Sequence, residues 1–92
     1  MKFEWDDGKA IVNLKKHGVS FEEAQTVFDN PLAVIFDDEA HSFDELREII
    51  IGHSQLNRLL IIAFTERSTN IRIISARLAT RKEREEYEQQ YF

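Results

Sequence analysis

The alternation of apolar and polar positions near the start of the chain predicts one short strand and two helices. Residues 3–5 alternate apolar and polar and are typical of a strand. Asp6 or Asp7 can cap a helix that runs to about His17, where Gly18 supplies the residue with positive φ. A second helix begins after Ser20 and ends before Pro31. Its predicted buried stripe consists of Phe21, Ala24, Val27 and Phe28.

The second helix also begins with the pattern of a capping box, Ser20-Phe21-Glu22-Glu23. In this motif the hydroxyl of Ser20 accepts the N–H of Glu23, and the carboxylate of Glu23 reaches back to the N–H of Ser20. The motif would account fully for Glu23 without any catalytic role.

The middle of the chain predicts four strands, at residues 33–36, 46–52, 58–65 and 71–77. Short turns at 55–57 and 68–70 separate the last three, and strands joined in this way form an antiparallel meander. Every position from 59 to 64 is apolar, which favours a central strand covered on both faces. The sequence therefore predicts one α+β domain over residues 1–92.

A second capping box, Thr80 to Glu83, predicts a terminal helix that reaches about Gln90. This helix is mostly charged, with only Tyr87, Tyr91 and Phe92 to bury. We expect it to dock loosely on the sheet or to offer a surface to a partner.

Composition narrows the class of protein. The 92 residues contain 42% hydrophobic and 32% charged side chains, as expected for a globular domain. There is no cysteine, which excludes disulfides and thiolate chemistry. The N-terminus lacks the apolar stretch of a signal peptide, and no apolar run is long enough to span a bilayer. We expect a soluble, cytoplasmic protein.

Positive and negative side chains are not spread evenly along the chain. The net charge is −5, which argues against a nucleic-acid binder. From Arg67 to Lys82, however, there are five positive residues and no negative one. A cationic site on an acidic body is therefore compatible with the sequence.

Several segments together resemble the BrnT family of toxins. The segment KHGVSFEEA at residues 16–24 and the segment IRIISARLAT at residues 71–80 are the most specific. The resemblance also includes Phe3-Glu4-Trp5-Asp6, Lys9-Ala10, Asn13, Arg47, Ile51-Gly52, Ser54, Arg58, Thr65, Arg67, Glu83-Arg84 and Tyr87. The stretch 41–47 departs from the family pattern by lacking a glycine and a second glutamate, so no role is carried over to His41.

The resemblance implies a ribonuclease toxin with a RelE-like fold that blocks translation by cutting RNA without a metal. It also implies a ribbon-helix-helix antitoxin, BrnA-like, which binds the toxin and represses the operon. Operator DNA would be contacted only through that antitoxin.

Cutting RNA without a metal needs a base for the 2′-hydroxyl proton, positive donors for the phosphorane and an acid for the leaving oxygen. Arg67 and Arg77 are the leading candidates for the donors, because a guanidinium meets two phosphate oxygens at once. We expect Arg77 to share a strand face with Ile71, Ile73 and Ser75. If the last two strands pair without irregularity, Arg67 lies opposite the first residues of the last strand, far from Arg77. At ~3.3 Å per residue the two arginines are then separated by roughly 20 Å. Both could equally be ordinary surface arginines.

Other candidates lie on the helices and the basic stretch. Lys16 and His17 end the first helix, where the helix dipole alone would favour positive charge. His17 could act as a base or an acid. Lys9, Arg72 and Arg81 could bind RNA phosphates, and Tyr87 could stack on a base or be buried against the sheet. The three histidines show no ligand-like spacing, so we expect no metal or other cofactor.

Two other functions compete with RNA cleavage. The chain could be a binding module that acts only through complex formation with an antitoxin, which its acidic charge would favour. A DNA-binding regulator is less well supported, because no helix carries a basic recognition face. Growth arrest upon expression of the protein alone would separate the first two functions.

Overall fold

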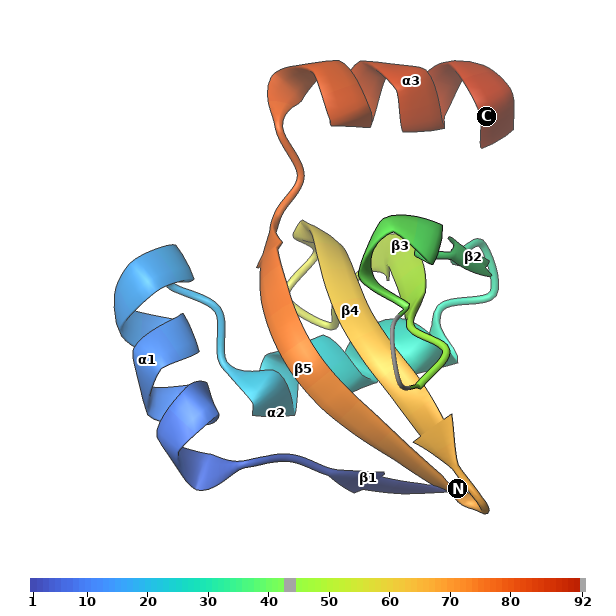
Figure 1. The fold of residues 1–92 in the computed structure, drawn as a ribbon. Coiled ribbons are helices and arrows are strands. Elements are labelled where there is room, and N and C mark those ends of the chain that lie inside the picture. Colours follow the sequence, from blue (N-terminus) through green and yellow to red (C-terminus); the bar gives the residue numbers. More distant parts are fainter. Residues whose placement is uncertain (43–44, 92) are drawn as a thin grey trace.

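The computed structural model describes residues 1–42 and 45–91. A five-stranded sheet with strand order β1-β5-β4-β3-β2 is packed with helices (Figure 1). In chain order the elements are β1 (Lys2–Glu4), α1 (Asp7–His17), α2 (Phe21–Gln25), the 3-10 helix η1 (Thr26–Asp29), β2 (Val34–Asp37), the 3-10 helix η2 (Glu39–His41), β3 (Glu48–His53), β4 (Leu59–Arg67), β5 (Asn70–Leu78) and α3 (Arg81–Tyr91).

The α+β class is confirmed. Strands β2 to β5 pair antiparallel in sequence order, and β1 adds to the free edge of β5 in parallel, so the sheet is mixed. Strand β4 lies in the middle of the sheet, as its unbroken apolar run predicts. The predicted second helix is divided, because the α-helical turns end at Gln25 and continue as the 3-10 helix η1.

The main core lies on one face of the sheet, between the strands and the α2–η1 segment. In Figure 1 this segment crosses behind the sheet while α1 flanks the outer edge of β5. The core includes the expected helix residues Phe21, Ala24 and Val27, which are fully buried, and packs against Phe28 at its margin. We call this side of the sheet the core face.

The first capping box forms only in part, which corrects the expectation for Glu23. The Ser20 Oγ accepts the N–H of Glu23 at 3.0 Å, as predicted. The Glu23 carboxylate, however, accepts bonds from Arg58 and from the hydroxyl of Ser54. Glu23 is 5% exposed. Leaving a buried carboxylate without a charged partner costs more free energy than leaving one N–H at an exposed helix end without a cap. Arg58 supplies the charged partner.

A bulge in β5 changes the direction of the side chains that follow it. Ala63 pairs with Ser75 and Phe64 pairs with Ile73, so Ile74 is an extra residue on β5. Ile71, Ile73 and Ala76 consequently all belong to the core.

The bulge places Arg77 opposite Ile61, and Arg72 opposite Thr65. Ile61 and Thr65 are four residues apart on β4, so both arginines project from the face opposite the core. The expectation that Arg77 shares a face with Ile71 and Ile73 is therefore wrong. We call this second side the groove face.

Helix α3 crosses one end of the groove face (Figure 1). Its capping box is complete: Thr80 Oγ1 accepts the N–H of Glu83, and Glu83 accepts the N–H of Thr80. Tyr87 is 3% exposed and packs with Ile51 and Leu59 in a second small core. The described helices include none that is long and apolar enough to cross a membrane.

Candidate functional site

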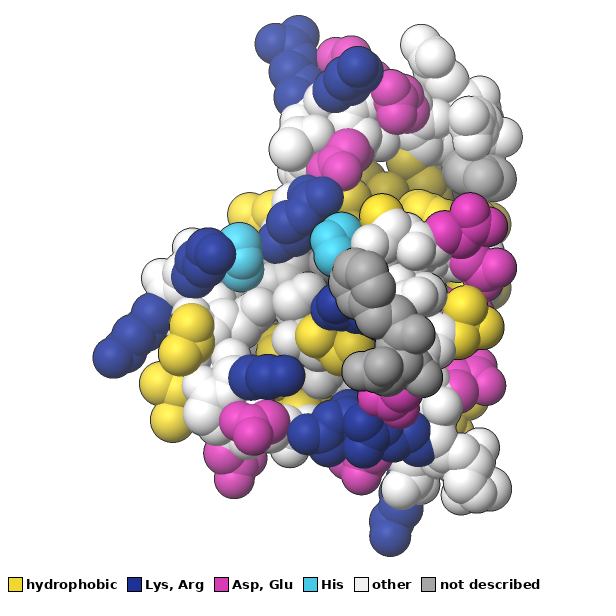
Figure 2. Space-filling model, in the orientation of Figure 1, with side chains coloured by type: hydrophobic (Ala, Val, Ile, Leu, Met, Phe, Trp, Pro, Cys, Tyr) yellow, Lys and Arg dark blue, Asp and Glu magenta, His cyan; other side chains and the backbone are white. Residues whose placement is uncertain are grey.

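Two adjoining hollows on the groove face share lining residues, and we call them together the groove. The first, of about 310 Å³, is lined by Lys9, Arg67 and Arg72, and the second, of about 250 Å³, by Arg77 and Ser75. His41 and Arg47 line both hollows and so mark the point where they join. Figure 2 shows Lys, Arg and His side chains gathered around the middle of this face.

The groove is electropositive although the chain is acidic. Five cationic side chains line it in the described part of the chain, against the two carboxylates of Glu45 and Asp38. The cations come from α1, from the segment before β3, and from β4 and β5. The five cations are Lys9, Arg47, Arg67, Arg72 and Arg77.

Arg67 and Arg77 lie at opposite ends of the groove. Arg67 ends β4, and Arg77 pairs with Ile61, six residues earlier on that strand. At ~3.3 Å per residue this is roughly 20 Å between the two backbone positions, so the large separation expected from the register is confirmed and the two arginines are poorly placed to share one phosphate.

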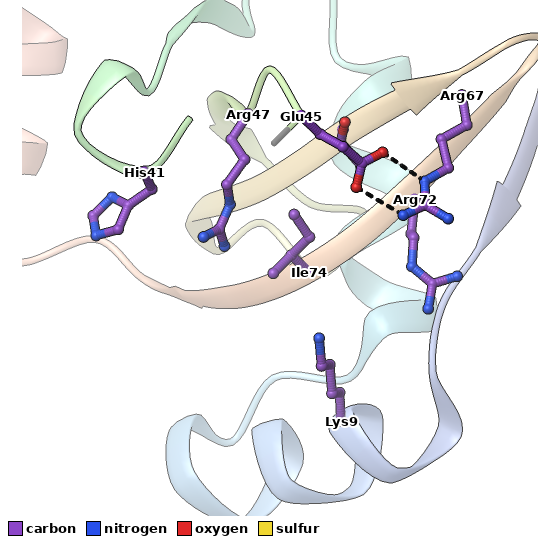
Figure 3. A pocket seen from close by; sticks show the side chains of 8 residues that line it. Lys9, His41, Glu45, Arg47, Arg67, Arg72 and Ile74 are labelled. Atoms are coloured by element: carbon purple, nitrogen blue, oxygen red, sulfur yellow. Dashed lines mark hydrogen bonds and ion pairs between the residues drawn. The ribbon is translucent and has the colours of Figure 1, made fainter. Parts of the chain in front are cut away.

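Each of these two arginines is held by a carboxylate. Arg67 donates to both oxygens of Glu45, at 2.9 and 2.7 Å, as drawn in Figure 3. Arg77 donates to both oxygens of Glu83, at 2.8 and 2.9 Å. These bonds lower the pKa of the Glu45 carboxyl, and they lower the pKa of Glu83 from 4.5 to about 2. Both acids therefore stay ionised at neutral pH.

Arg47 and Arg72 differ from this pair because no described carboxylate engages them. The Nε of Arg47 is buried and has no hydrogen-bond partner among the described atoms. Burying such a donor without a partner costs about 1–3 kcal/mol. Figure 3 shows Arg47 in the middle of the groove and Arg72 beside the Arg67–Glu45 pair, with Lys9 reaching from α1. An anion in the groove would meet cations that form no ion pair with a carboxylate among the described residues.

Lys16 and His17 do not line the groove that holds the arginines. They line a separate hollow of about 530 Å³ between α1 and β5, which touches the groove through Lys9, Ile74 and Ser75. Neither hollow of the groove is lined by His17.

The remaining two candidates lie away from the groove. Arg81 stands on α3 with a side chain that is 92% exposed, paired with Glu85 one turn along. Tyr87 is buried, and its hydroxyl donates to the carbonyl of Leu32. Of the two fates considered for Tyr87, burial against the sheet is the one observed.

Sequence reasoning missed Arg47 and His41 as groove residues. His41 belongs to a polar stretch without helical or strand periodicity, so pattern alone does not orient it. Arg47 falls inside the strand predicted at residues 46–52, whereas β3 begins at Glu48. The signal that could have found Arg47 is its place among the residues that carry the resemblance. In residues 1–42 and 45–91, no group of three or more His, Cys, Asp or Glu side chains is arranged to hold a metal ion.

Comparison with known families identifies the chain. Residues 5–83 match the family model described as the ribonuclease toxin BrnT of type II toxin-antitoxin systems. The chain belongs to the BrnT family. The match begins at Trp5 and ends at Glu83, the acid that holds Arg77, so it includes all five groove cations.

The fold agrees with this assignment to the BrnT family. The crystal structure of the ribonuclease toxin BrnT of Brucella abortus superposes with a TM-score of 0.69 and 24% sequence identity, covering 88% of this chain and 99% of that one. No curated protein sequence matches the chain. As a BrnT-family toxin of a type II system, the protein has a cognate antitoxin as its expected partner.

Proposed function

We propose that this BrnT-family protein is a metal-independent endoribonuclease that binds the phosphate backbone of RNA along the groove. The observation that carries the proposal is the gathering of five cationic side chains around one groove on a chain of net charge −5. Nothing in the packing of the fold requires so many cations on one face, and phosphate is the ligand that such a surface favours.

The cations of the two hollows would have different roles in RNA binding and cleavage. Arg77 and Arg47 line the hollow beside His41, where a scissile phosphate would sit. Their positive charge would stabilise the extra negative charge of the pentavalent phosphorane. Lys9, Arg67 and Arg72 line the other hollow and would hold a neighbouring phosphate of the same strand. Lys16 and His17 would contact RNA only if the strand continued into the adjoining hollow.

The decisive test is cleavage of RNA by the purified protein in EDTA. Arg77→Ala should lower the cleavage rate by about 10²–10³-fold. Because this variant also frees Glu83, Arg77→Lys serves as a second variant that keeps the charge and loses the paired donors. Arg84→Ala, an exposed change on α3, is the matched control and should cleave like the wild type. Absence of cleavage by folded protein would favour the binding module that acts only through complex formation.

We also propose a ribbon-helix-helix antitoxin as the partner, within a RelE-like architecture and a cytoplasmic setting. Strand β2 lies at the sheet edge, and its Ile35 and Phe36 are each 50% exposed. An edge strand with exposed apolar side chains is suited to pairing with another chain. Such a complex would bring operator DNA to the toxin only through the antitoxin. Phe36→Glu should abolish co-purification of the antitoxin and leave RNA cleavage intact.

A further inference from the structure

His41 stands over the groove with one side of its ring fixed by a carboxylate. The Nδ1 of His41 lies 3.0 and 3.1 Å from the two carboxylate oxygens of Asp38. The side chain of Asp38 is 14% exposed and that of His41 is 62% exposed. The carboxylate is thus largely sheltered while the imidazole remains open to the groove.

The segment that carries this pair is tied to the start of β3. The N–H of Asp38 donates to the carbonyl of Arg47 at 2.8 Å. The hydroxyl of Ser42 donates to the carbonyl of Asp38 at 2.8 Å and accepts the N–H of Arg47 at 2.9 Å. These bonds fix the backbone on both sides of His41 relative to Arg47, so the imidazole and the guanidinium are presented together (Figure 3).

The surrounding groups leave few alternatives for proton transfer. Glu45 is engaged by Arg67 and Glu83 by Arg77, and each carboxyl has a lowered pKa, which makes it a weak base. Among the described residues, the other charged groups that line the two hollows with His41 are the Asp38 carboxylate and the five cations already named. Imidazole is the side-chain group suited to gaining and losing a proton near neutral pH.

A carboxylate at Nδ1 selects the ring form that carries its proton there. Nδ1–H then donates to Asp38, and Nε2 is left with a lone pair directed away from the carboxylate. When Nε2 takes a proton, the Asp38 carboxylate stabilises the resulting imidazolium. This is the arrangement expected of a general base with a positioning acid behind it.

We propose that His41, oriented by Asp38, is the general base that removes the proton from the attacking 2′-hydroxyl of RNA. The inference rests on the proposed ribonuclease function and adds a residue that the sequence left without a role. The 2′-oxygen bonds to phosphorus, the bond from phosphorus to the 5′-oxygen breaks, and the products are a 2′,3′-cyclic phosphate and a 5′-hydroxyl. The 2′-hydroxyl proton passes to Nε2 of His41, and the leaving 5′-oxygen takes a proton from solvent water. Arg47 and Arg77 hold the phosphate beside the ring.

The test is the pH dependence of RNA cleavage by the full chain. His41→Ala should cleave about 10²–10⁴-fold more slowly and lose the rise in rate from acidic to neutral pH. Added imidazole should restore part of the activity of His41→Ala and leave the wild type unchanged. Binding of a 2′-O-methyl RNA, which cannot be cut, should change less than threefold, which separates catalysis from binding. Asp38→Asn should slow cleavage about 10–100-fold, because an amide can present either its oxygen or its N–H to Nδ1 and no longer selects one ring form.

Two further variants keep the proposal falsifiable. His53→Gln, outside the groove and packed against Tyr87, is the matched control and should retain the wild-type pH profile. If His17→Ala loses the rise in rate and His41→Ala retains it, His17 is the base and the proposal is overturned. If the wild type itself does not cut RNA, the proposed function fails, whereas a cutting wild type with an unaffected His41→Ala refutes only this inference.

Discussion

The side chain of Asn13 on α1 hydrogen-bonds both backbone polar groups of Ala76, 63 positions away on β5. Its Nδ2 donates to the carbonyl of Ala76 at 2.8 Å, and the N–H of Ala76 donates to its Oδ1 at 3.1 Å. The same Nδ2 also donates to the carbonyl of Val19 at 2.9 Å. The pairs of β1 with β5 end at Arg72, so this amide takes the place of a strand neighbour where β5 leaves its bulge.

Removing this amide should destabilise the whole domain. Asn13 is 6% exposed, so Asn13→Ala leaves the N–H and the carbonyl of Ala76 buried without partners. We expect the free energy of unfolding to fall by about 2–4 kcal/mol, measured by urea denaturation. Lys15→Ala, on the exposed side of α1, is the control. A change below about 0.5 kcal/mol in Asn13→Ala would show that water replaces the amide.

The groove makes different predictions for two arginines that sequence reasoning treated alike. Arg72 lines the groove without a described carboxylate partner, whereas Arg81 stands exposed on α3. Arg72→Ala should weaken binding of 2′-O-methyl RNA about 3–10-fold and reduce the salt slope of log K by about 0.7, the value of one phosphate contact on a single strand. Arg81→Ala should bind within about twofold of the wild type. Equal losses in both variants would place RNA outside the groove.

Glu45 should restrain RNA binding rather than support it. Its pair with Arg67 is about half exposed on both sides, and an exposed pair of this kind contributes little to stability. Glu45→Gln should leave the midpoint of urea denaturation unchanged and tighten RNA binding about 2–5-fold, because it removes a negative charge from the groove. Glu88→Gln, the same change on the exposed surface of α3, controls for the lower net charge. Weaker binding by Glu45→Gln would mean that Glu45 orients Arg67 for RNA.

Glu83 should make stability depend on pH in the acidic range. Its pKa in the folded protein is about 2, below its ordinary value of 4.5, because Arg77 and the N–H of Thr80 bond to the charged form. Because the pKa of Glu83 is lowered on folding, its charged carboxylate stabilises the fold at pH values above about 4.5. This contribution is lost as the pH falls from about 4.5 towards 2.

The corresponding variant is Glu83→Gln. It should reduce the free energy of unfolding by about 1–2 kcal/mol at pH 7, allowing for the partial exposure of the pair, with the difference from wild type vanishing near pH 2. Thermal denaturation across this range measures it. A difference that persists unchanged at pH 2 would show that Glu83 acts through packing instead of charge.

The fold was more accessible from the sequence than the site, for a physical reason. Gly18, Ser20 and Thr80 mark helix ends through local chemistry, and the apolar run of β4 reports burial on both faces, so these elements follow from neighbouring residues. The bulge at Ile74 lies two residues before Ala76, whose backbone bonds to the distant amide of Asn13, and no short-range sequence pattern indicates the bulge.

The error in the predicted face of Arg77 came from that bulge, since strict alternation holds only in a strand of regular pairing. The ion pair of Glu23 with Arg58 is another long-range effect. The two residues are 35 positions apart, so a motif of neighbouring residues cannot predict their contact. Arg47 and His41 were missed because only the folded chain shows what the segment before β3 faces.

The bulge also determines how β5 tolerates changes in length. Arg72 and Arg77 are five positions apart, an odd spacing that would send them to opposite faces of a regular strand. Deleting the extra residue Ile74 would give an even spacing of four, which keeps both arginines on the groove face of a regular strand but removes the bulge. Natural relatives that keep the groove should therefore hold these two arginines either five positions apart with a bulge or four apart without one.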